Sequence, residues 1–483
     1  MKSLGFIALF AATAVAAPNA SYEKSGITDW DKVPAATKEP TFRPPVAKRL
    51  KLKNGMALLV VENKALPIAS MLLVVPGAGT SADPAGKAGL AAFTADLLDE
   101  GAGGMAALAL AGEQDRLGAS ITALSDADAG YVAVSTLSRT LDQTLELVSK
   151  IVTQPAFDAK EFERVKGDRS IALDLRRDRP REVAGIVLAG ALYGPKSAYG
   201  HPGGGTREEL KGLAIADAQT FYKEHWNPAA MTLVVAGDVD ANVLRTKLDA
   251  GLGAWKPAGV KPIAKITATP EKLGKRALLT DRPAAAQSDV RIGLVGPDRK
   301  DPRFFQFEVL RTTLGDGFTS RLVQKLREEM GIIYNGNASQ DWRLQPGPFV
   351  ISVAIQTPDT ARGISEIVKM LDDLSTNEIP AAELDKSKQN IIRALPAQFG
   401  SNASTVAALG ELALHGLPDN YYATYAGNIR KVNAKDVKAT AKALIPSNRM
   451  VFSIVGDLSK TRADLDKLNL GEVALFDPYG VAK

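Results

Sequence analysis

Short apolar runs bounded by turn residues predict the strands in the first half of the chain. Residues 57–61 and 70–75 are short and rich in β-branched side chains, and a turn at residues 65–67 separates them, as in two successive strands. Residues 131–135 alternate between apolar and polar side chains, which is typical of a half-buried strand. Residues 231–236 are mostly apolar and are followed by Gly237-Asp238, which predicts a buried strand that ends there.

Two longer stretches predict helices between these strands. Residues 89–98 are apolar at helical length, and residues 141–152 place their apolar side chains close to the helical period. The connections are short enough for hairpins or are themselves helical. We therefore expect an α+β protein with a largely antiparallel sheet that is backed by helices.

The chain contains an internal duplication. Residues 227–239 read NPAAMTLVVAGDV, and residues 446–458 read PSNRMVFSIVGDL, so that Met231 corresponds to Met450. A second match aligns residues 57–59 with residues 277–279. The distance in sequence between these two segments exceeds the distance between Met231 and Met450 by a single position. Two matches at nearly the same spacing predict two homologous halves, each with its own sheet and helices.

The first residues resemble an export signal. Lys2 is followed by an apolar run over residues 4–15, and Ala14-Val15-Ala16 fits the small-x-small rule for cleavage. Residues 1–16 are therefore interpreted as a signal peptide, with a buried N-terminal helix as the alternative. Because the chain lacks cysteine and needs no oxidative folding, the bacterial periplasm is the expected compartment.

The remaining chain divides by composition. Residues 17–46 are polar and proline-rich and predict an extended N-terminal arm. The two halves are expected at residues 47–255 and 276–483. A linker over residues 256–275, with three prolines and several lysines, is expected to join them.

Composition excludes several classes of function. Apolar residues make up 45% of the 483 residues and charged residues 23%, which is typical of a globular protein. The net charge of +5 is small for this length and does not predict binding to nucleic acid. No stretch after the signal is apolar and long enough for a membrane span. The absence of cysteine excludes disulfides, thiol nucleophiles and cysteine metal sites.

Four stretches in order resemble the insulinase/pitrilysin-like metallopeptidases, which include mitochondrial processing peptidase. They are LKNGMALLVVEN (52–63), SAYGHPGGGTREELKGL (197–213), FYKEHWNPAAMTLVVAGDVD (221–240) and GDGFTSRLVQKLREEMGIIY (315–334). The resemblance implies a mitochondrial processing peptidase-like fold of two homologous halves. It also implies a zinc site in the first half, whose H-x-x-E-H motif supplies two histidines and the glutamate that activates water.

The resemblance also implies that the catalytic residues are missing. Ala92 stands at the first histidine of the motif, Ala95 at the glutamate and Asp96 at the second histidine. The distal glutamate ligand aligns near Ala172. No metal is therefore expected in this chain.

Histidine is too scarce to build a substitute zinc site. A catalytic zinc uses about three protein ligands, and the chain has only His201, His225 and His415. These positions lie too far apart in the sequence for any two of them to share a helical i,i+4 face. We interpret each as a packing or capping residue.

An arginine and a tyrosine seven positions apart remain in the second half. In the family such a pair holds the substrate backbone near the zinc, and Arg327 and Tyr334 have this spacing. Gly315-Asp316-Gly317 opens a loop, residues 320–322 start a helix, and Gly331 ends it. Alternatively, Arg327 belongs to a solvated helix face and Tyr334 to the core.

Two weaker signals lie in the first half. The glycines of residues 200–206 suggest a phosphate loop, but the lysine and hydroxyl residue of such loops do not follow, so a family loop is the interpretation. The basic run at residues 176–181 is interpreted as a solvated helix end or as a partner contact.

Three hypotheses for function follow. The leading one is a non-catalytic subunit of a heterodimeric peptidase, in which Arg327 and Tyr334 bind a peptide while a zinc-bearing sister chain with H-x-x-E-H cuts it. The second is a purely structural or interaction protein derived from a peptidase. The third, an autonomous peptidase with an unusual metal site, conflicts with the histidine count.

Overall fold

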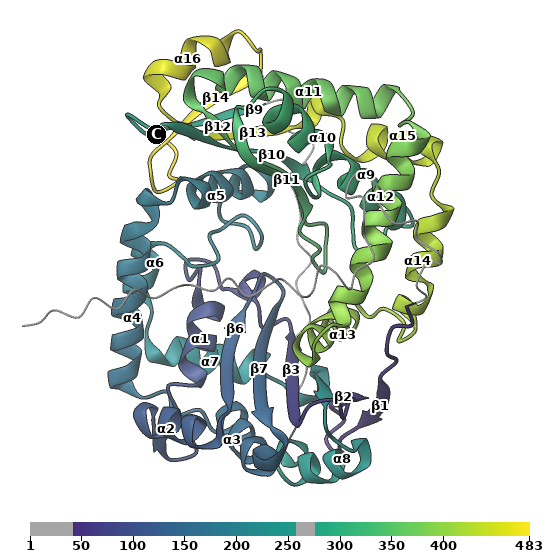
Figure 1. Cartoon of the computed structure of the whole chain (residues 1–483). Coiled ribbons are helices and arrows are strands. Elements are labelled where there is room, and N and C mark those ends of the chain that lie inside the picture. The colour runs from purple at the N-terminus through teal and green to yellow at the C-terminus, as the bar shows by residue number, and fades with distance from the viewer. Residues whose placement is uncertain (1–41, 257–275) are drawn as a thin grey trace, which may run out of the picture. The chain divides into compact units, whose positions relative to one another are not determined.

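The computed structural model describes residues 42–256 and 276–483. The predicted signal peptide (1–16), nearly all of the predicted arm and nearly all of the predicted linker lie outside the described residues. The described part contains two assemblies of sheet and helices, which confirms the α+β fold (Figure 1).

The first sheet is mostly antiparallel. Its order is β1-β2-β8-β3-β7-β6, so β6 lies at one edge, and only the β2–β8 pair is parallel. Its strands are Lys48–Lys51 (β1), Ala57–Glu62 (β2), Ile68–Pro76 (β3), Ser120–Ser125 (β6), Ala129–Leu137 (β7) and Thr232–Gly237 (β8). A two-stranded ribbon of Gly101–Ala102 (β4) and Met105–Ala106 (β5) accompanies it.

The second sheet has a similar order with β11 at one edge, but both the β9–β13 and the β9–β14 pairs are parallel. Its order is β11-β12-β10-β13-β9-β14. Its strands are Arg276–Asp281 (β9), Gln287–Val295 (β10), Ile333–Gln340 (β11), Pro348–Gln356 (β12), Val451–Gly456 (β13) and Glu472–Phe476 (β14).

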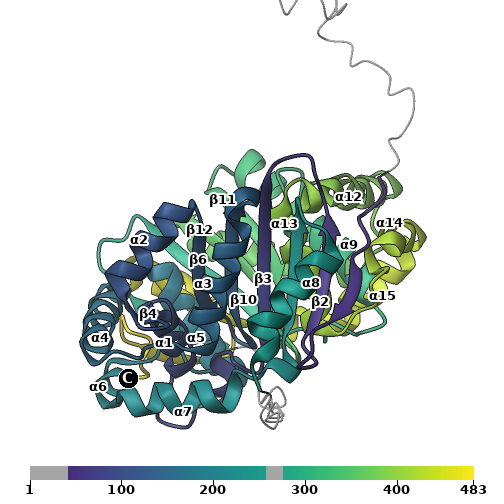
Figure 2. The same ribbon diagram turned by 90° about the horizontal axis from the view of Figure 1, so that it is seen from below.

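Helices cover both sheets (Figure 2). Those before the gap are Leu90–Leu98 (α1), Ala107–Leu117 (α2), Leu141–Thr153 (α3), Ala159–Asp174 (α4), Pro180–Tyr193 (α5), Arg207–Gly212 (α6), Ile215–His225 (α7) and Ala241–Ala250 (α8). Those after it are Phe304–Gly315 (α9), Arg321–Val323 (α10), Thr360–Thr376 (α11), Ala381–Ala394 (α12), Asn402–His415 (α13), Tyr421–Lys431 (α14), Ala434–Leu444 (α15) and Leu458–Asp466 (α16). A π-helix, Gln324–Glu329 (η7), continues α10.

Strand register refines the predicted duplication. In the first sheet Ala57 lies opposite Thr232, and in the second Arg276 lies opposite Val451. The distance in sequence from β2 to β9 therefore equals the distance from β8 to β13, so Ala57 corresponds to Arg276. The predicted match of Ala57 with Ala277 is wrong by a single position. Such a shift in a strand exchanges the faces of the sheet, so the register decides which side chains of β9 correspond to those of β2.

Helix α5 precedes the second sheet in sequence but packs on that sheet (Figure 1). Its buried Val187 and Leu188 share one apolar cluster with Leu278 of β9 and Val451 of β13. Gly293 of β10 leaves room for this helix, because a Cβ there would lie 3.0 Å from Leu188 Cδ2. Burying each such aliphatic side chain contributes about 1.5–3 kcal/mol.

Helix α13 makes the reciprocal contact with the first sheet. Its buried Val406 and Leu409 share a cluster with Leu59 of β2 and Val234 of β8. On the same helix Gly410 faces β3 closely, since a Cβ there would lie 2.8 Å from a methyl of Leu72. Each sheet thus completes its core with a helix that comes from the other half of the sequence.

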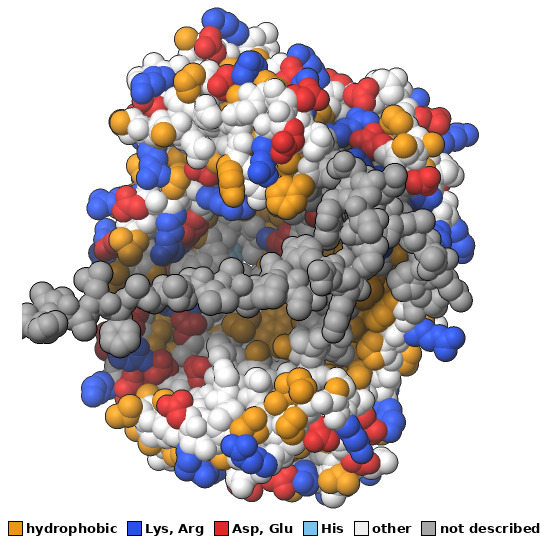
Figure 3. Space-filling view, viewed as in Figure 1, with side chains coloured by type: hydrophobic (Ala, Val, Ile, Leu, Met, Phe, Trp, Pro, Cys, Tyr) orange, Lys and Arg blue, Asp and Glu red, His pale blue; other side chains and the backbone are white. Residues whose placement is uncertain are grey.

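Within the described residues, no helix combines the length and the apolar character that a bilayer crossing requires. On the face seen in Figure 3, basic and acidic side chains are interspersed rather than gathered by sign.

We predict that Leu409→Ala lowers the free energy of unfolding by about 2–5 kcal/mol, because it leaves a cavity where α13 meets the first sheet. Leu108→Ala on α2 is the matched control, since Leu108 is 86% exposed, and it should change stability by less than about 0.5 kcal/mol. Denaturant unfolding followed by circular dichroism measures both. Equal effects of the two substitutions would contradict the reciprocal packing.

Candidate functional site

Helix α1 carries the positions that the H-x-x-E-H motif would occupy. The helix begins after Gly89, which has a φ of 87°. The carboxylate of Asp83 accepts hydrogen bonds from the backbone N–H groups of Gly89 (2.6 Å) and Ala91 (2.7 Å) and so fixes the start of the helix. Ala92 is partly exposed, whereas Ala95 is buried in the core. Neither side chain can bind a metal.

The third motif position forms an ion pair. Asp96 Oδ2 lies 2.7 Å from Nη2 of Arg169 on α4 and 2.8 Å from its Nε. Arg169 precedes Ala172, the aligned distal-ligand position, by nearly one helical turn. The guanidinium also lies 5.7 Å from the ring centroid of Phe93. A fixed cation therefore joins α1 to α4 where active family members are expected to use a divalent metal.

The three histidines all make local contacts. His201 Nε2 lies 3.0 Å from the carbonyl oxygen of Thr80, and His225 Nδ1 lies 2.7 Å from that of Gly77. His415 is buried on α13, with Nε2 3.3 Å from Glu411. In the described part of the chain, no group of three or more histidine, cysteine or acidic side chains is arranged to hold a metal ion.

The basic run at residues 176–181 is only partly solvated. Arg176 is 6% exposed, and its guanidinium donates to the carbonyl oxygen of Gly205 at 3.1 and 3.2 Å. Gly205 has a φ of 76°, and a Cβ there would lie 2.3 Å from the Ala88 carbonyl oxygen. Arg176 therefore holds the glycine loop against the start of α1, which corrects the interpretation of the whole run as a solvated end.

A cavity of about 580 Å³ adjoins this loop. It is lined by Ala92 of α1, Ser125 at the end of β6 and Arg181 of α5, and from the second half of the sequence by Arg291 of β10 and by Arg343. Its size suits a small ligand or part of a peptide. One of the missing metal-ligand positions thus faces a cavity with three arginines in its wall.

Arg327 lies on the π-helix η7. The wider turn shows in the hydrogen bonds from Met330 N to Lys325 O (3.1 Å) and from Ile332 N to Leu326 O (2.9 Å). The turn ends at Gly331, whose φ of 67° requires glycine or a strained residue. Single π turns in α-helices are frequently found at functional sites.

Tyr334 lies on the edge strand β11, within an irregular register. Ile333 pairs with Ile355, but the next paired residue is Gly336, opposite Val353, so the strand bulges at Tyr334. Bulges redirect side chains, and Tyr334 is 79% exposed. The alternative that Tyr334 belongs to the core is therefore wrong.

The two distortions bring the predicted pair together. The Arg327 guanidinium lies 5.3 Å from the centroid of the Tyr334 ring and 5.4 Å from that of Phe318. Phe318 is also exposed, at 72%. Neither Arg327 nor Tyr334 lines the cavity described above. Arg327 Nε also lies 3.4 Å from Glu328, and the Arg327 side chain is 32% exposed. The pair is therefore separate from that cavity, with two exposed aromatic rings beside a partly exposed, ion-paired arginine.

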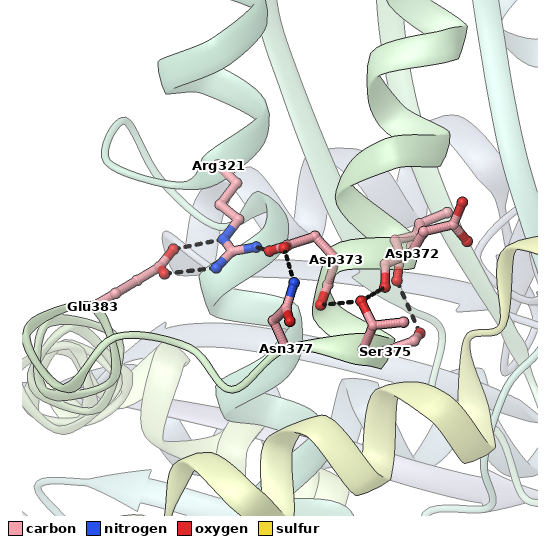
Figure 4. Close-up of polar contacts among 8 residues, drawn as sticks. Arg321, Asp372, Asp373, Ser375, Asn377 and Glu383 are labelled. Carbon is pink, nitrogen blue, oxygen red and sulfur yellow. Dashed lines mark hydrogen bonds and ion pairs between the residues drawn. The ribbon is translucent and has the colours of Figure 1, made fainter.

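A partly buried arginine anchors the helix that leads into η7, on which Arg327 lies. Arg321 begins α10 and donates to both oxygens of Glu383 on α12 at 2.8 Å (Figure 4). Its remaining nitrogen lies 2.6 Å from Asp373 on α11, whose other oxygen accepts from Asn377. This bidentate arrangement is geometrically specific, and it fixes α10 against two neighbouring helices.

Sequence reasoning did not assign four residues of these two regions to a site, although Arg181 belongs to the basic run at residues 176–181. Phe318 could have been suspected, because it is a large apolar residue in a loop rich in glycine. The arginines 181, 291 and 343 meet only through tertiary structure, and their sequence positions carry no shared pattern.

Two repeated halves, with neutral or ion-paired side chains at the metal-ligand positions, define an inactive homologue of a two-half metallopeptidase. A model of the insulinase family (peptidase family M16) matches residues 58–177, and a model of the peptidase M16 inactive domain matches residues 213–391. The chain belongs to the M16 peptidase family.

Curated relatives span nearly the same length. An uncharacterized zinc protease of Mycobacterium tuberculosis is 24% identical over 419 residues, which cover 86% of this chain and 94% of the relative. A protein of Helicobacter pylori named non-peptidase homolog YmxG is 22% identical over 408 residues, which cover 83% of this chain and 92% of the relative.

Solved structures share the fold. A peptidase M16 inactive domain from Pseudomonas fluorescens superposes with a TM-score of 0.78 at 22% identity, covering 85% of this chain and 97% of that chain. A chain of complex III2 from Candida albicans superposes with a TM-score of 0.73 at 16% identity, covering 87% and 99%. The same fold therefore occurs in a protein named as a peptidase M16 inactive domain and in a chain of complex III2.

We predict a pH-dependent contribution of Asp83 to stability. Burial raises the pKa of Asp83 to about 7, against the opposing effect of its two N–H donors. Between pH 4 and pH 7 the folded state then holds a proton that the unfolded state has released, so the contribution of Asp83 falls as pH rises.

Unfolding free energies of the wild type and Asp83→Asn at pH 4.5, 5.5, 6.5 and 7.5 test this prediction. The unfolding free energy of the wild type minus that of Asp83→Asn should decrease as pH increases. A difference that is constant, or that moves in favour of the wild type, would mean that the helix N–H donors outweigh burial.

Proposed function

We propose that this chain is the non-catalytic subunit of a two-chain zinc peptidase and that it binds the peptide which a sister chain cuts. The observation that carries the proposal is the Arg327–Tyr334 pair. A π turn and a β-bulge keep both side chains accessible, although an aromatic ring exposed to this extent contributes little to the core. On this proposal the zinc and the H-x-x-E-H motif belong to the partner.

The substrate is a peptide or unfolded segment held in an extended form. Both β6 and β11 lie at sheet edges, and an edge strand can pair with an added strand through its free backbone groups. Tyr334 lies on β11 itself, so a peptide at this edge passes directly beside the pair. Backbone pairing of this kind gives affinity with modest dependence on sequence.

Arg327 and Tyr334 suit the stabilisation of a peptide carbonyl during cleavage. A guanidinium is permanently charged and offers several donors to a carbonyl oxygen or a developing oxyanion. A tyrosine hydroxyl adds one donor on a rigid ring. A charge-assisted hydrogen bond from Arg327 contributes about 1.5–3 kcal/mol.

The proposed place of action is the periplasm. It is supported by the signal-like residues 1–16 and by the lack of cysteine. The heterodimer then forms between two exported chains. An adjacent exported reading frame with the H-x-x-E-H motif would agree with this arrangement.

A purely structural role is the second candidate. It is favoured by the likeness to a chain of complex III2 from Candida albicans and by the name non-peptidase homolog of the Helicobacter pylori relative. A structural role has no need of an accessible Arg327–Tyr334 pair. Kinetic measurements on that pair therefore separate the two candidates.

We predict that the isolated mature chain binds no stoichiometric zinc and cleaves no peptide, because neutral or ion-paired groups stand at the ligand positions. Co-purification from the native host should yield a homologous partner with one zinc per complex. Metal analysis by mass spectrometry and peptide hydrolysis measure this. One zinc per isolated chain would contradict the proposal.

We predict that Arg327→Ala or Tyr334→Phe lowers kcat of the two-chain complex by about 10- to 100-fold, because each change removes a donor to the transition state. The complex should still assemble in size-exclusion chromatography. Arg245→Ala on α8 is the matched control, because Arg245 is an exposed arginine of the first half. Unchanged kinetics in the Arg327 and Tyr334 variants would contradict the proposal and favour the purely structural role.

A further inference from the structure

The cavity beside the missing metal site has an excess of positive charge. Arg181 approaches from the first turn of α5, and Arg291 approaches from β10. Burial and the nearby charge of Arg181 lower the pKa of Arg291. Two like charges from separate elements therefore line one partly enclosed space.

No acidic group of the described chain pairs with either arginine. Arg291 donates to the hydroxyl of Ser352, and Arg181 makes no ion pair within 4.0 Å in the described residues. Asp289 on β10 makes no ion pair with them within 4.0 Å in the same residues. Burial raises the pKa of Asp289 against the opposing charges of Arg291 and Arg181, so this carboxylate lies near both arginines. Asp289 therefore offsets part of the positive charge, but neither guanidinium makes the direct carboxylate contact that an anionic ligand would supply.

The two acidic residues in the cavity wall are already satisfied. Asp126 accepts the hydroxyl of Tyr131 at 2.6 Å and two backbone N–H groups at 2.8 Å. Glu182 lies 3.1 Å from Arg176 and 3.6 Å from Arg179. Both carboxylates therefore contact groups other than Arg181 and Arg291.

A neutral donor in the wall also lacks a partner. The hydroxyl of Ser125 is buried without a hydrogen bond to any described residue, and Ser125 belongs to the cavity wall at the end of edge strand β6. Arg343 lies in the same wall but is paired with Asp341 at 2.7 Å and stacks 4.5 Å from the ring of Tyr199. The donors without a described partner are therefore those of Arg181 and Ser125 and the N–H groups of Arg291 that do not donate to Ser352.

The geometry points to a carboxylate-binding site: Arg181, Arg291 and Ser125 bind a carboxylate of an extended peptide in the cavity that Ala92 leaves open. Guanidinium groups bind carboxylates through charge-assisted hydrogen bonds. The carboxylate comes from the peptide C-terminus or from an Asp or Glu side chain. This inference deepens the proposed function by naming the peptide class, and it concerns this chain alone.

The experiment measures binding of fluorescent octapeptides to the full mature chain by anisotropy. One neutral sequence is made with an amidated C-terminus, with a free C-terminal carboxylate, and as an amidated version with one central aspartate. At least one carboxylate peptide should bind about 10-fold more tightly than the neutral amide. Which of the two does so identifies the source of the carboxylate.

Arg291→Gln and Arg181→Gln should each reduce that preference about 10-fold, and Arg245→Gln should leave it unchanged. Arg181 is exposed and is expected to tolerate substitution, so its variant serves as the test even where Arg291→Gln unfolds. Equal affinity for all three peptides would overturn the inference, as would a preference that survives both substitutions. This binding assay involves neither a partner nor turnover. Its failure would therefore not decide the kinetic test of Arg327 and Tyr334, which tests the proposed function separately.

Discussion

The reciprocal burial of α5 and α13 is the contact on which the rest of the structure depends. Each sheet presents an apolar face that its own half of the sequence does not fully cover, and a helix from the other half covers it. The glycines at 293 and 410 permit the close approach of helix and strand. The same contact positions Arg181, at the start of α5, near Arg291 on the sheet that α5 covers.

The positions that correspond to the metal ligands carry a different charge arrangement. The Asp96–Arg169 ion pair joins α1 to α4, so these helices need no metal to hold them. Zinc bound by a protein is itself a large local charge that attracts anionic and polarisable groups. Here the positive charge that faces the cavity comes instead from arginine, which can bind an anion but cannot activate water as a metal does.

Local sequence patterns predicted the strands and helices around the site, because these elements follow periods that a short window contains. The missing ligands at 92, 95 and 96 could be read once the resemblance had aligned helix α1. The spacing of Arg327 and Tyr334 was equally visible. The π turn and the bulge that bring these two together were not, because each is a departure from the regular period.

Long-range contacts could not be predicted from local sequence patterns, because they form only when the whole fold packs. The burial of Arg176 depends on a carbonyl 29 residues away, and the pairing of Asp96 with Arg169 spans 73 residues. The match between β2 and β9 looked sound because Ala-Leu-Leu recurs, yet only the hydrogen-bond register shows that the true correspondence begins at Arg276. Such pairings are chosen by the packing of the whole fold.

The central claim is that this chain holds a peptide which its partner cuts. Photo-cross-linking tests it most directly, with benzoylphenylalanine replacing Tyr334 in the two-chain complex and a labelled peptide substrate present. The account predicts a cross-link from position 334 to the peptide. The same probe at position 243, an exposed residue of α8, should give no such product. Cross-links from position 334 that never include the peptide would contradict the account.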